Sequence, residues 1–129
     1  MDTSGANEGF TVLVDDYDEA TILVLRGELD LSTLPLFRER SIELAQRNRA
    51  AVVIDASGLT FIDSTGIHGL IEAESTIHQN GTKLSIVPSS QVERLLDMLG
   101  LERHFVTYPT VEAAIGFWRR PEARNDESR

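Results

Sequence analysis

The sequence predicts an α/β domain in which a mixed β-sheet is flanked by about four helices. Two apolar stretches near the start, residues 10–14 and 20–25, are separated by a polar gap of five residues. This gap is too short for a crossover helix, so we expect the two strands to pair as an antiparallel hairpin. Further along, strand-like and helix-like stretches alternate, which favours parallel pairing with right-handed crossovers. The expected order is ββαβαβαβα.

The first predicted helix follows the hairpin, after Gly27 interrupts the strand pattern. Ser32 or Thr33 can cap it, and Pro35 suits its first turn because proline is tolerated at helix N-termini. The helix should end near Asn48. Its spacing places on one face the residues that we expect to be buried: Leu34, Phe37, Ser41, Leu44 and Ala45.

A continuous apolar run at residues 51–54 is typical of a strand that is covered on both faces. We expect this strand to end at Asp55 and residues 56–62 to form a loop. A second helix should follow from residue 64 to Gln79, closed by Asn80-Gly81. Its predicted buried face consists of Ile67, Leu70, Ile71 and Ile77.

The last third of the sequence predicts two strands and two helices. A strand at residues 83–87 precedes a helix that Ser90 and Glu93 could open as a capping box and Gly100 ends. A short edge strand at 105–107 leads to a final helix capped by Thr110. The expected inward faces are Val92, Leu95, Leu96 and Leu99 in the third helix and Val111, Ala114, Ile115 and Trp118 in the fourth. Residues 1–9 and 119–129 lack periodicity, so we predict flexible tails around one domain of residues 10–118.

Charge and composition limit the classes of function. The 129-residue chain has a net charge of −9, which argues against direct nucleic-acid binding and is compatible with a basic protein partner. The absence of cysteine excludes disulfides and thiolate metal sites. No apolar run approaches the ~20 residues that span a bilayer, and the N-terminus lacks the pattern of a signal peptide. We therefore expect a cytoplasmic protein without a membrane segment.

The candidate functional residues are Asp63-Ser64-Thr65-Gly66, at the predicted entry to the second helix. In an α/β sheet, ligands and reactive groups gather where strands end and helices begin. The first three residues could serve only as a helix cap, because Asp, Ser and Thr are preferred there. Gly66 goes beyond the needs of a cap, since a glycine in the first turn weakens the helix and lets another backbone approach closely.

A hydrolase is one alternative for the same residues. Ser64 and His68 stand four apart on one predicted helix, so a nucleophile–base pair is conceivable. No third member is evident, and the surrounding sequence is not the glycine-flanked turn of α/β hydrolases. The histidines at positions 68, 78 and 104 also lack metal-ligand spacing, and no phosphate-binding glycine loop occurs. We expect no metal and no cofactor.

A phospho-receiver domain of the two-component type is the other alternative. Asp15-Asp16 follow the first strand and Asp55, the phosphoacceptor in this interpretation, ends an apolar strand. Together they would hold Mg²⁺ through carboxylate oxygens. Against this, a receiver needs a helix after its acidic pair, whereas residues 20–25 favour a strand.

Three stretches of the sequence resemble the signatures of the STAS family. They are Gly-Glu-Leu-Asp at 27–30, the stretch 59–67 around Asp63-Ser64-Thr65-Gly66, and residues 95–101. The similarity extends over about residues 10–118 and is greatest to free-standing bacterial anti-sigma factor antagonists. It implies a STAS-like mixed sheet flanked by helices, and a binding module rather than an enzyme. It further implies an anti-sigma factor serine kinase and a PP2C-type phosphatase as partners, with ATP belonging to the kinase.

The resemblance also implies roles for individual residues. The unphosphorylated form would bind the kinase and release the sigma factor, and phosphorylation of Ser64 would end this binding. Asp30 falls where family members contact the kinase, and Thr65 offers a second hydroxyl beside the acceptor. His68 departs from the family, which often has a small residue there. The expected partner-binding residues are Asp30, Asp63, Ser64, Thr65, Gly66 and His68.

Overall fold

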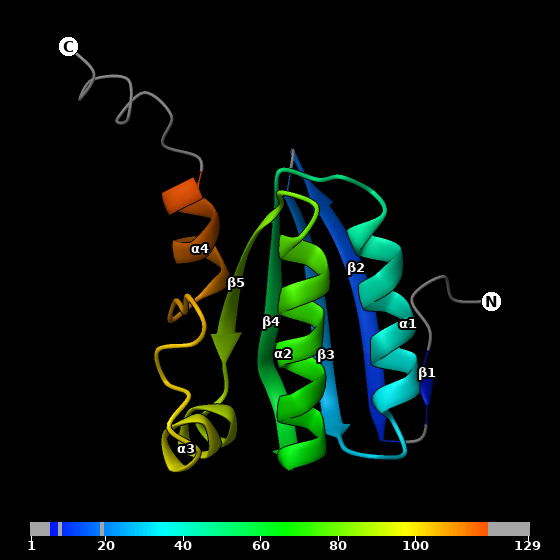
Figure 1. Ribbon diagram of the computed structural model, residues 1–129, viewed down its shortest axis with the longest axis vertical. Coiled ribbons are helices and arrows are strands. Elements are labelled where there is room, and N and C mark those ends of the chain that lie inside the picture. Colours follow the sequence, from blue (N-terminus) through cyan, green and yellow to red (C-terminus); the bar gives the residue numbers. More distant parts are fainter. Residues whose placement is uncertain (1–5, 8, 19, 119–129) are drawn as a thin grey trace.

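The computed structural model describes residues 6–7, 9–18 and 20–118, whose strands form one sheet in the order β1-β2-β3-β4-β5 (Figure 1). The strands are β1 (Ala6–Asn7), β2 (Phe10–Tyr17), β3 (Ala20–Leu29), β4 (Ala51–Ile62) and β5 (Lys83–Pro88). The helices are α1 (Leu34–Ala45), α2 (Ser64–His78), α3 (Ser90–Met98) and α4 (Val111–Trp118). The β1–β2 and β2–β3 pairs are antiparallel, and the β3–β4 and β4–β5 pairs are parallel. The predicted mixed sheet with an N-terminal hairpin is confirmed.

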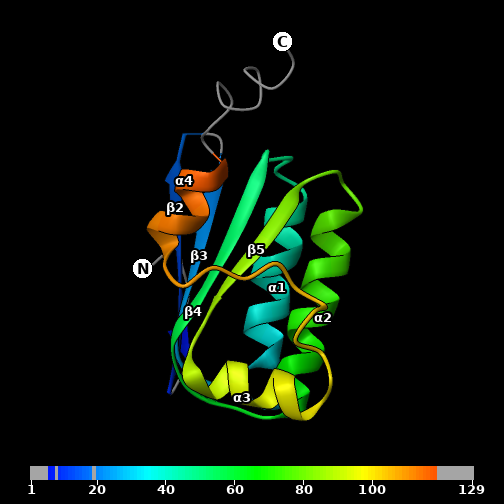
Figure 2. The ribbon, with the colours of Figure 1, turned by 90° about the vertical axis from the view of Figure 1, so that its left-hand side faces the viewer.

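Helices cover both faces of the sheet. In Figure 2, α1 and α2 lie on one face and α4 on the other, while α3 crosses the end at which the parallel strands finish. Val52 and Ile54 belong to the core beneath α1 and α2, whereas Val53 packs with Ile115 of α4. Because successive side chains of a strand point to opposite faces, the apolar run at 51–54 is covered on both sides as predicted.

Strand β4 is longer than the sequence predicts. It continues past Asp55 to Ile62, so the predicted end of the strand and the predicted loop at 56–62 are wrong. The pairing of this polar segment with β3 contains register shifts, at which β4 carries extra residues without ending the strand. At Gly58, a Cβ atom would lie 3.0 Å from the Leu25 carbonyl oxygen, so a glycine lets the two strands stay close.

Strand β3 also runs through a predicted break. Gly27 does not end the strand but adopts a φ of +100° within it, a conformation that favours glycine. The next residue, Glu28, donates its backbone N–H to the Gly9 carbonyl oxygen at 2.7 Å. Residues 6–7 pair with β2, so the predicted N-terminal tail of residues 1–9 includes a short paired segment. The predicted tail at 119–129 lies outside the described residues.

Most helix faces are as predicted, with differences at the ends of elements. The buried residues of α1 are the five expected ones. Ser89, rather than Ser90, caps α3, since its hydroxyl accepts from the Val92 backbone N–H at 3.2 Å. The predicted edge strand at 105–107 is reduced to a single bridge to Ile86. Leu99, expected inside, is exposed, and the side chain of Trp118 lies outside the described part. None of the described helices is long and apolar enough to cross a membrane.

The N-terminal end of the parallel strands is held by a charged cluster around Asp16. One carboxylate oxygen of Asp16 accepts from the buried Thr21 hydroxyl at 2.8 Å, and the other pairs with Arg47 at 2.8 Å. Arg49 lies 3.9 Å from the same carboxylate and also donates to the Ala20 carbonyl oxygen. The Thr21 hydrogen bond and the Arg47 guanidinium lower the pKa of Asp16 below its usual range. This cluster ties β2 and β3 to the segment that enters β4.

The opposite end of the sheet depends on a close contact of helix α2 with β3. At Gly66, in the first turn of α2, an added Cβ would lie 2.6 Å from the Leu29 carbonyl oxygen and 2.7 Å from Cγ1 of Ile62. Only a residue without a side chain fits, because the nearest atom belongs to the backbone and cannot rotate away. The close backbone approach expected of Gly66 is therefore an approach to the last residue of β3.

We expect Asp16→Asn to weaken folding in a pH-dependent way. Because folding lowers the pKa of Asp16, its contribution is complete above the ordinary carboxyl range and is lost as the pH falls through the lowered value. At pH 7 the free energy of unfolding should drop by about 0.5 kcal/mol, the scale of a largely exposed ion pair. Urea unfolding at pH 7 and at about pH 2 measures the difference, which should vanish at the lower pH. The control is Asp15→Asn, and equal losses in both variants would contradict this role of Asp16.

Gly66→Ala should lower the free energy of unfolding by about 1–2 kcal/mol, since the cost of overpacking exceeds the gain in helix propensity. Gly116→Ala in α4 is the matched control, because nothing lies within 4 Å of its added Cβ. The control should be neutral or gain up to about 1 kcal/mol. Chemical denaturation of both variants tests this, and a stabilised Gly66→Ala would show that the contact with Leu29 is not tight.

Candidate functional site

The candidate site lies where two neighbouring parallel strands end. Leu29, the last residue of β3, pairs with Ile62, the last residue of β4. Asp30 and Asp63 therefore leave the sheet from adjacent positions at one edge, near the lower end of the molecule in Figure 1. Carboxyl ends of parallel strands are the usual location of functional groups in α/β folds. The structure thus brings together two sequence segments that lie more than thirty residues apart.

Asp63 is the N-cap of α2. Its backbone is extended, and its carboxylate accepts from the Gly66 backbone N–H at 3.0 Å. Its carbonyl oxygen accepts from the Ile67 N–H at 3.0 Å. Of the three residues that could have capped the helix, Asp63 alone does so, which leaves the hydroxyls of Ser64 and Thr65 without this structural task.

Ser64 is the first residue of α2 and is exposed. No residue in the described part of the chain hydrogen-bonds to its hydroxyl. Thr65 is half-buried, and His68, one turn further along, is exposed. Within the same part, no hydrogen bond joins Ser64 to His68 and no third group supports the pair, so the geometry does not favour the hydrolase alternative. Ser64 is instead an accessible hydroxyl on a rigid helix end.

Asp30 holds the turn between β3 and α1. Its Oδ1 atom accepts from the backbone N–H of Ser32 at 3.0 Å, from the Ser32 hydroxyl at 2.9 Å and from the Thr33 N–H at 3.3 Å. The Ser32 hydroxyl hydrogen bond is the main cause that lowers the pKa of Asp30. Thr33 stands at the N-cap position of α1, but its side chain caps nothing and donates to the Glu28 carbonyl oxygen at 2.8 Å. The capping role expected of Ser32 or Thr33 is therefore not observed, and the Asp30 carboxylate stabilises the turn before the helix instead.

The acidic pocket of a phospho-receiver is not present. Asp55 lies in the middle of β4, where its carboxylate accepts from the Ser57 hydroxyl at 2.6 Å and from the Ser57 N–H at 3.1 Å. Asp16 pairs with Thr21 near the opposite end of the sheet, in the cluster with Arg47. The described residues contain no group of three side chains able to hold a metal ion. The receiver alternative, with Asp55 as phosphoacceptor, is therefore wrong.

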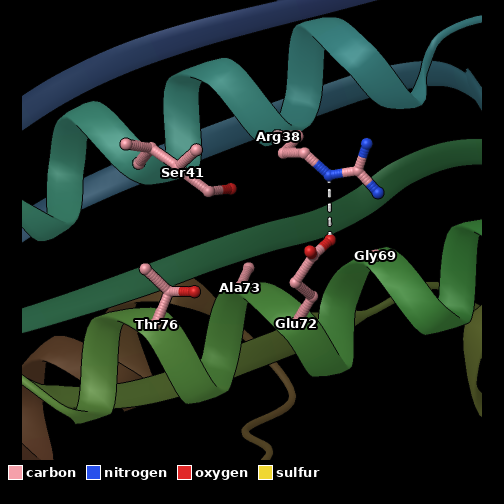
Figure 3. Close-up of a pocket in the computed structure, with 7 residues that line it drawn as sticks. Arg38, Ser41, Gly69, Glu72, Ala73 and Thr76 are labelled. Atoms are coloured by element: carbon pink, nitrogen blue, oxygen red, sulfur yellow. Dashed lines mark hydrogen bonds and ion pairs between the residues drawn. The ribbon is translucent and has the colours of Figure 1, made fainter.

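A small cavity between α1 and α2 lies apart from the site. Figure 3 shows that Arg38 of α1 reaches across it to Glu72 of α2, with their charged atoms 3.0 Å apart. The cavity has a volume of about 40 Å³, enough for a few water molecules and far below that of a cofactor site. None of the predicted site residues lines it.

Comparisons with known proteins identify the family of the chain. A model of the STAS domain matches residues 11–114. The anti-sigma-F factor antagonist RsfB of Mycobacterium tuberculosis is 31% identical over 111 residues, which cover 85% of this chain and 90% of that protein. The anti-sigma-B factor antagonist of Staphylococcus epidermidis is 29% identical over 93 residues, covering 71% of this chain and 83% of its own length.

A solved structure supports the same assignment. The crystal structure of an anti-sigma factor antagonist from Mycobacterium paratuberculosis superposes with a TM-score of 0.78 and 27% sequence identity. The match covers 86% of this chain and 95% of that one. Sequence and fold thus agree over nearly the whole of the described domain, and the chain belongs to the STAS-domain family of anti-sigma factor antagonists.

Proposed function

We propose that the unphosphorylated protein binds an anti-sigma factor that is a serine kinase, and that phosphorylation of Ser64 by this kinase ends the binding. The observation that carries the proposal is the exposed Ser64 hydroxyl at the first position of α2, free of any partner in the described structure. A kinase can reach such a hydroxyl without unfolding the helix. A PP2C-type phosphatase can reach the phosphorylated side chain in the same way and reset the switch.

The fold should tolerate a phosphate at Ser64. A phosphoserine adds about −1.5 to −2 charges at pH 7. The first backbone N–H groups of a helix have no intrahelical acceptor, and the helix dipole favours negative charge there by roughly 0.3–1 kcal/mol. Because Asp63 already occupies the Gly66 N–H, the phosphate would meet the N–H groups that precede it. Phosphorylation therefore changes the surface and leaves the domain intact.

Binding should respond much more strongly than stability. A partner surface shaped for a neutral hydroxyl beside Asp63 meets an added charge after phosphorylation. One negative charge about 6 Å from an acidic partner group costs roughly 3 kcal/mol at an effective dielectric near 20. Each 1.4 kcal/mol is about tenfold in affinity, so charge alone should weaken the complex on the order of a hundredfold.

The remaining members of the proposed partner-binding surface differ in how they can act. Ser64 and His68 are exposed, and Asp30, Asp63 and Thr65 are half-exposed, so all five can meet a partner directly. Gly66 is buried and contributes by fixing the position of α2. The protein needs no cofactor in this scheme, since ATP belongs to the kinase. We place the interaction in the cytoplasm, where sigma factors act.

We expect Ser64→Ala to bind the anti-sigma factor constitutively and to resist phosphorylation. Ser64→Glu should stay folded and bind about a hundredfold more weakly, because it places a permanent charge at the switch position. Calorimetric titration of each variant against the purified anti-sigma factor measures the affinities, and circular dichroism confirms the fold.

The matched control is Ser75→Glu, which adds the same charge at an exposed position in the C-terminal half of α2. It should bind like the wild type, because its charge lies far from the helix N-terminus. Equal affinities for Ser64→Ala and Ser64→Glu would contradict a phosphorylation switch at this residue. Phosphate found on Thr65 in Ser64→Ala would move the acceptor by one position.

A further inference from the structure

The two most exposed large apolar side chains of the described residues lie at the same end of the molecule as Ser64. Leu31 and Met98 are each 73% exposed. Leu31 belongs to the turn between β3 and α1, and Met98 is the last residue of α3. Figure 1 shows α2 between α1 and α3 at this end of the sheet. Exposed apolar side chains that gather around a functional group indicate an interaction surface, whereas scattered ones do not.

The turn that carries Leu31 is rigid. The Asp30 carboxylate binds the N–H groups of Ser32 and Thr33, on the C-terminal side of Leu31. The backbone N–H of Leu34 donates to the Asp30 carbonyl oxygen at 2.9 Å, which closes the turn into the first turn of α1. The backbone that carries Leu31 is therefore already ordered, so a partner that covers the side chain does not have to order the turn.

The same hydrogen bonds change the interpretation of Asp30. Its Oδ1 atom already accepts hydrogen bonds within its own turn from the backbone N–H groups of Ser32 and Thr33 and from the Ser32 hydroxyl. A carboxylate engaged in this way shapes the backbone around Leu31 whether or not it bears a charge, because the contacts need only an oxygen acceptor. The side chain next to it, Leu31, is mostly exposed.

A partner that reaches the Ser64 hydroxyl must also cover this turn. The pairing of Leu29 with Ile62 and the contact of Gly66 with Leu29 place the turn directly beside the start of α2. A stable protein interface buries about 800 Å² on each partner, far more than a single serine offers. Its affinity usually comes from a few apolar anchors near its centre.

We propose that Leu31 and Met98 are the apolar anchors that the anti-sigma factor buries around Ser64, and that Asp30 is a positioning residue that presents Leu31. This inference rests on the function proposed above, since it assumes the same partner. It assigns the binding affinity to two side chains that phosphorylation does not touch. Ser64 then controls whether the anchors can be used.

The first test titrates the purified anti-sigma factor, with its nucleotide, against Leu31→Ala and Met98→Ala. Each variant should bind about tenfold to a hundredfold more weakly, the range expected when one buried aliphatic side chain is removed. Both should unfold like the wild type, because the deleted atoms are exposed. The control is Ile42→Ala, a 44% exposed aliphatic residue in the second half of α1, which should bind normally.

The second test separates the two roles of Asp30. Asp30→Asn keeps an oxygen acceptor for the turn and removes the charge, so it should bind within about threefold of the wild type. Asp30→Ala removes the acceptor and should weaken binding about as much as Leu31→Ala. In a double-mutant cycle, Asp30→Ala should add little once Leu31 is an alanine, because both act through the same contact.

The outcomes distinguish this inference from the switch at Ser64. Equal weakening by Asp30→Asn and Asp30→Ala would make Asp30 a charged contact and overturn its positioning role. Normal binding by Leu31→Ala and Met98→Ala, with weak binding by Ser64→Glu, would overturn the anchors and leave the switch standing. Normal binding by Ser64→Glu with weak binding by Leu31→Ala would overturn the switch and leave the anchors standing. If size-exclusion chromatography shows that Leu31→Ala dissociates a homodimer, the occupant is a second copy of this chain and the proposed partner for the anchors is wrong.

Discussion

The contact between Gly66 and the Leu29 carbonyl oxygen determines how the functional end of the protein is arranged. With α2 seated against the end of β3, the segments that follow β3 and β4 are held beside each other. The contact also fixes the rotation of the helix. Residues two apart on a helix point to nearly opposite sides, and residues four apart share a side. A buried Gly66 therefore requires Ser64 to face solvent, and it places His68 on the same exposed side.

The acidic residues at this end serve the backbone, which leaves the serine hydroxyl available. Asp63 binds the Gly66 N–H, and Asp30 binds the N–H groups of its own turn. The Asp63 carboxylate replaces an acceptor that the first turn of α2 lacks, and the Asp30 carboxylate stabilises the turn that leads into α1. Two stretches that resemble family signatures therefore encode a hydrogen-bonded turn, a helix cap and a close contact. The exposed Ser64, the proposed phosphoacceptor, directly follows the cap residue Asp63.

The fold could be predicted from the sequence where local pattern and tertiary environment agree. The apolar run at 51–54 and the buried face of α1 are such cases, because burial on two faces and helical period leave direct traces in the sequence. The second half of β4 has no such pattern in the sequence. Many of its residues are polar, and it includes Gly58. It forms a strand because β3 lies alongside, and register shifts accommodate the extra residues of β4 in this pairing. Tertiary pairing there outweighs local propensity.

The site could be predicted in part for the same reason. Asp63, Ser64 and Gly66 stand in one short stretch, so their junction with the helix was visible in the sequence. The role of Asp30 in its turn and the exposure of Leu31 depend on how β3 ends, and a leucine after a strand gives no sign of facing solvent.

The two ends of the sheet differ in the interactions of their polar side chains. At one end, ion pairs and hydrogen bonds around Asp16 and Arg49 join the hairpin to β4. The apolar core beneath α1 and α2 runs between the ends and does not include Ser64, the proposed switch residue. At the other end, the first turn of α2 carries the exposed Ser64 and the neighbouring turn the exposed Leu31. Because the core and the far cluster hold the fold, a charge added at Ser64 can change the surface that a partner meets without loosening the domain beneath it.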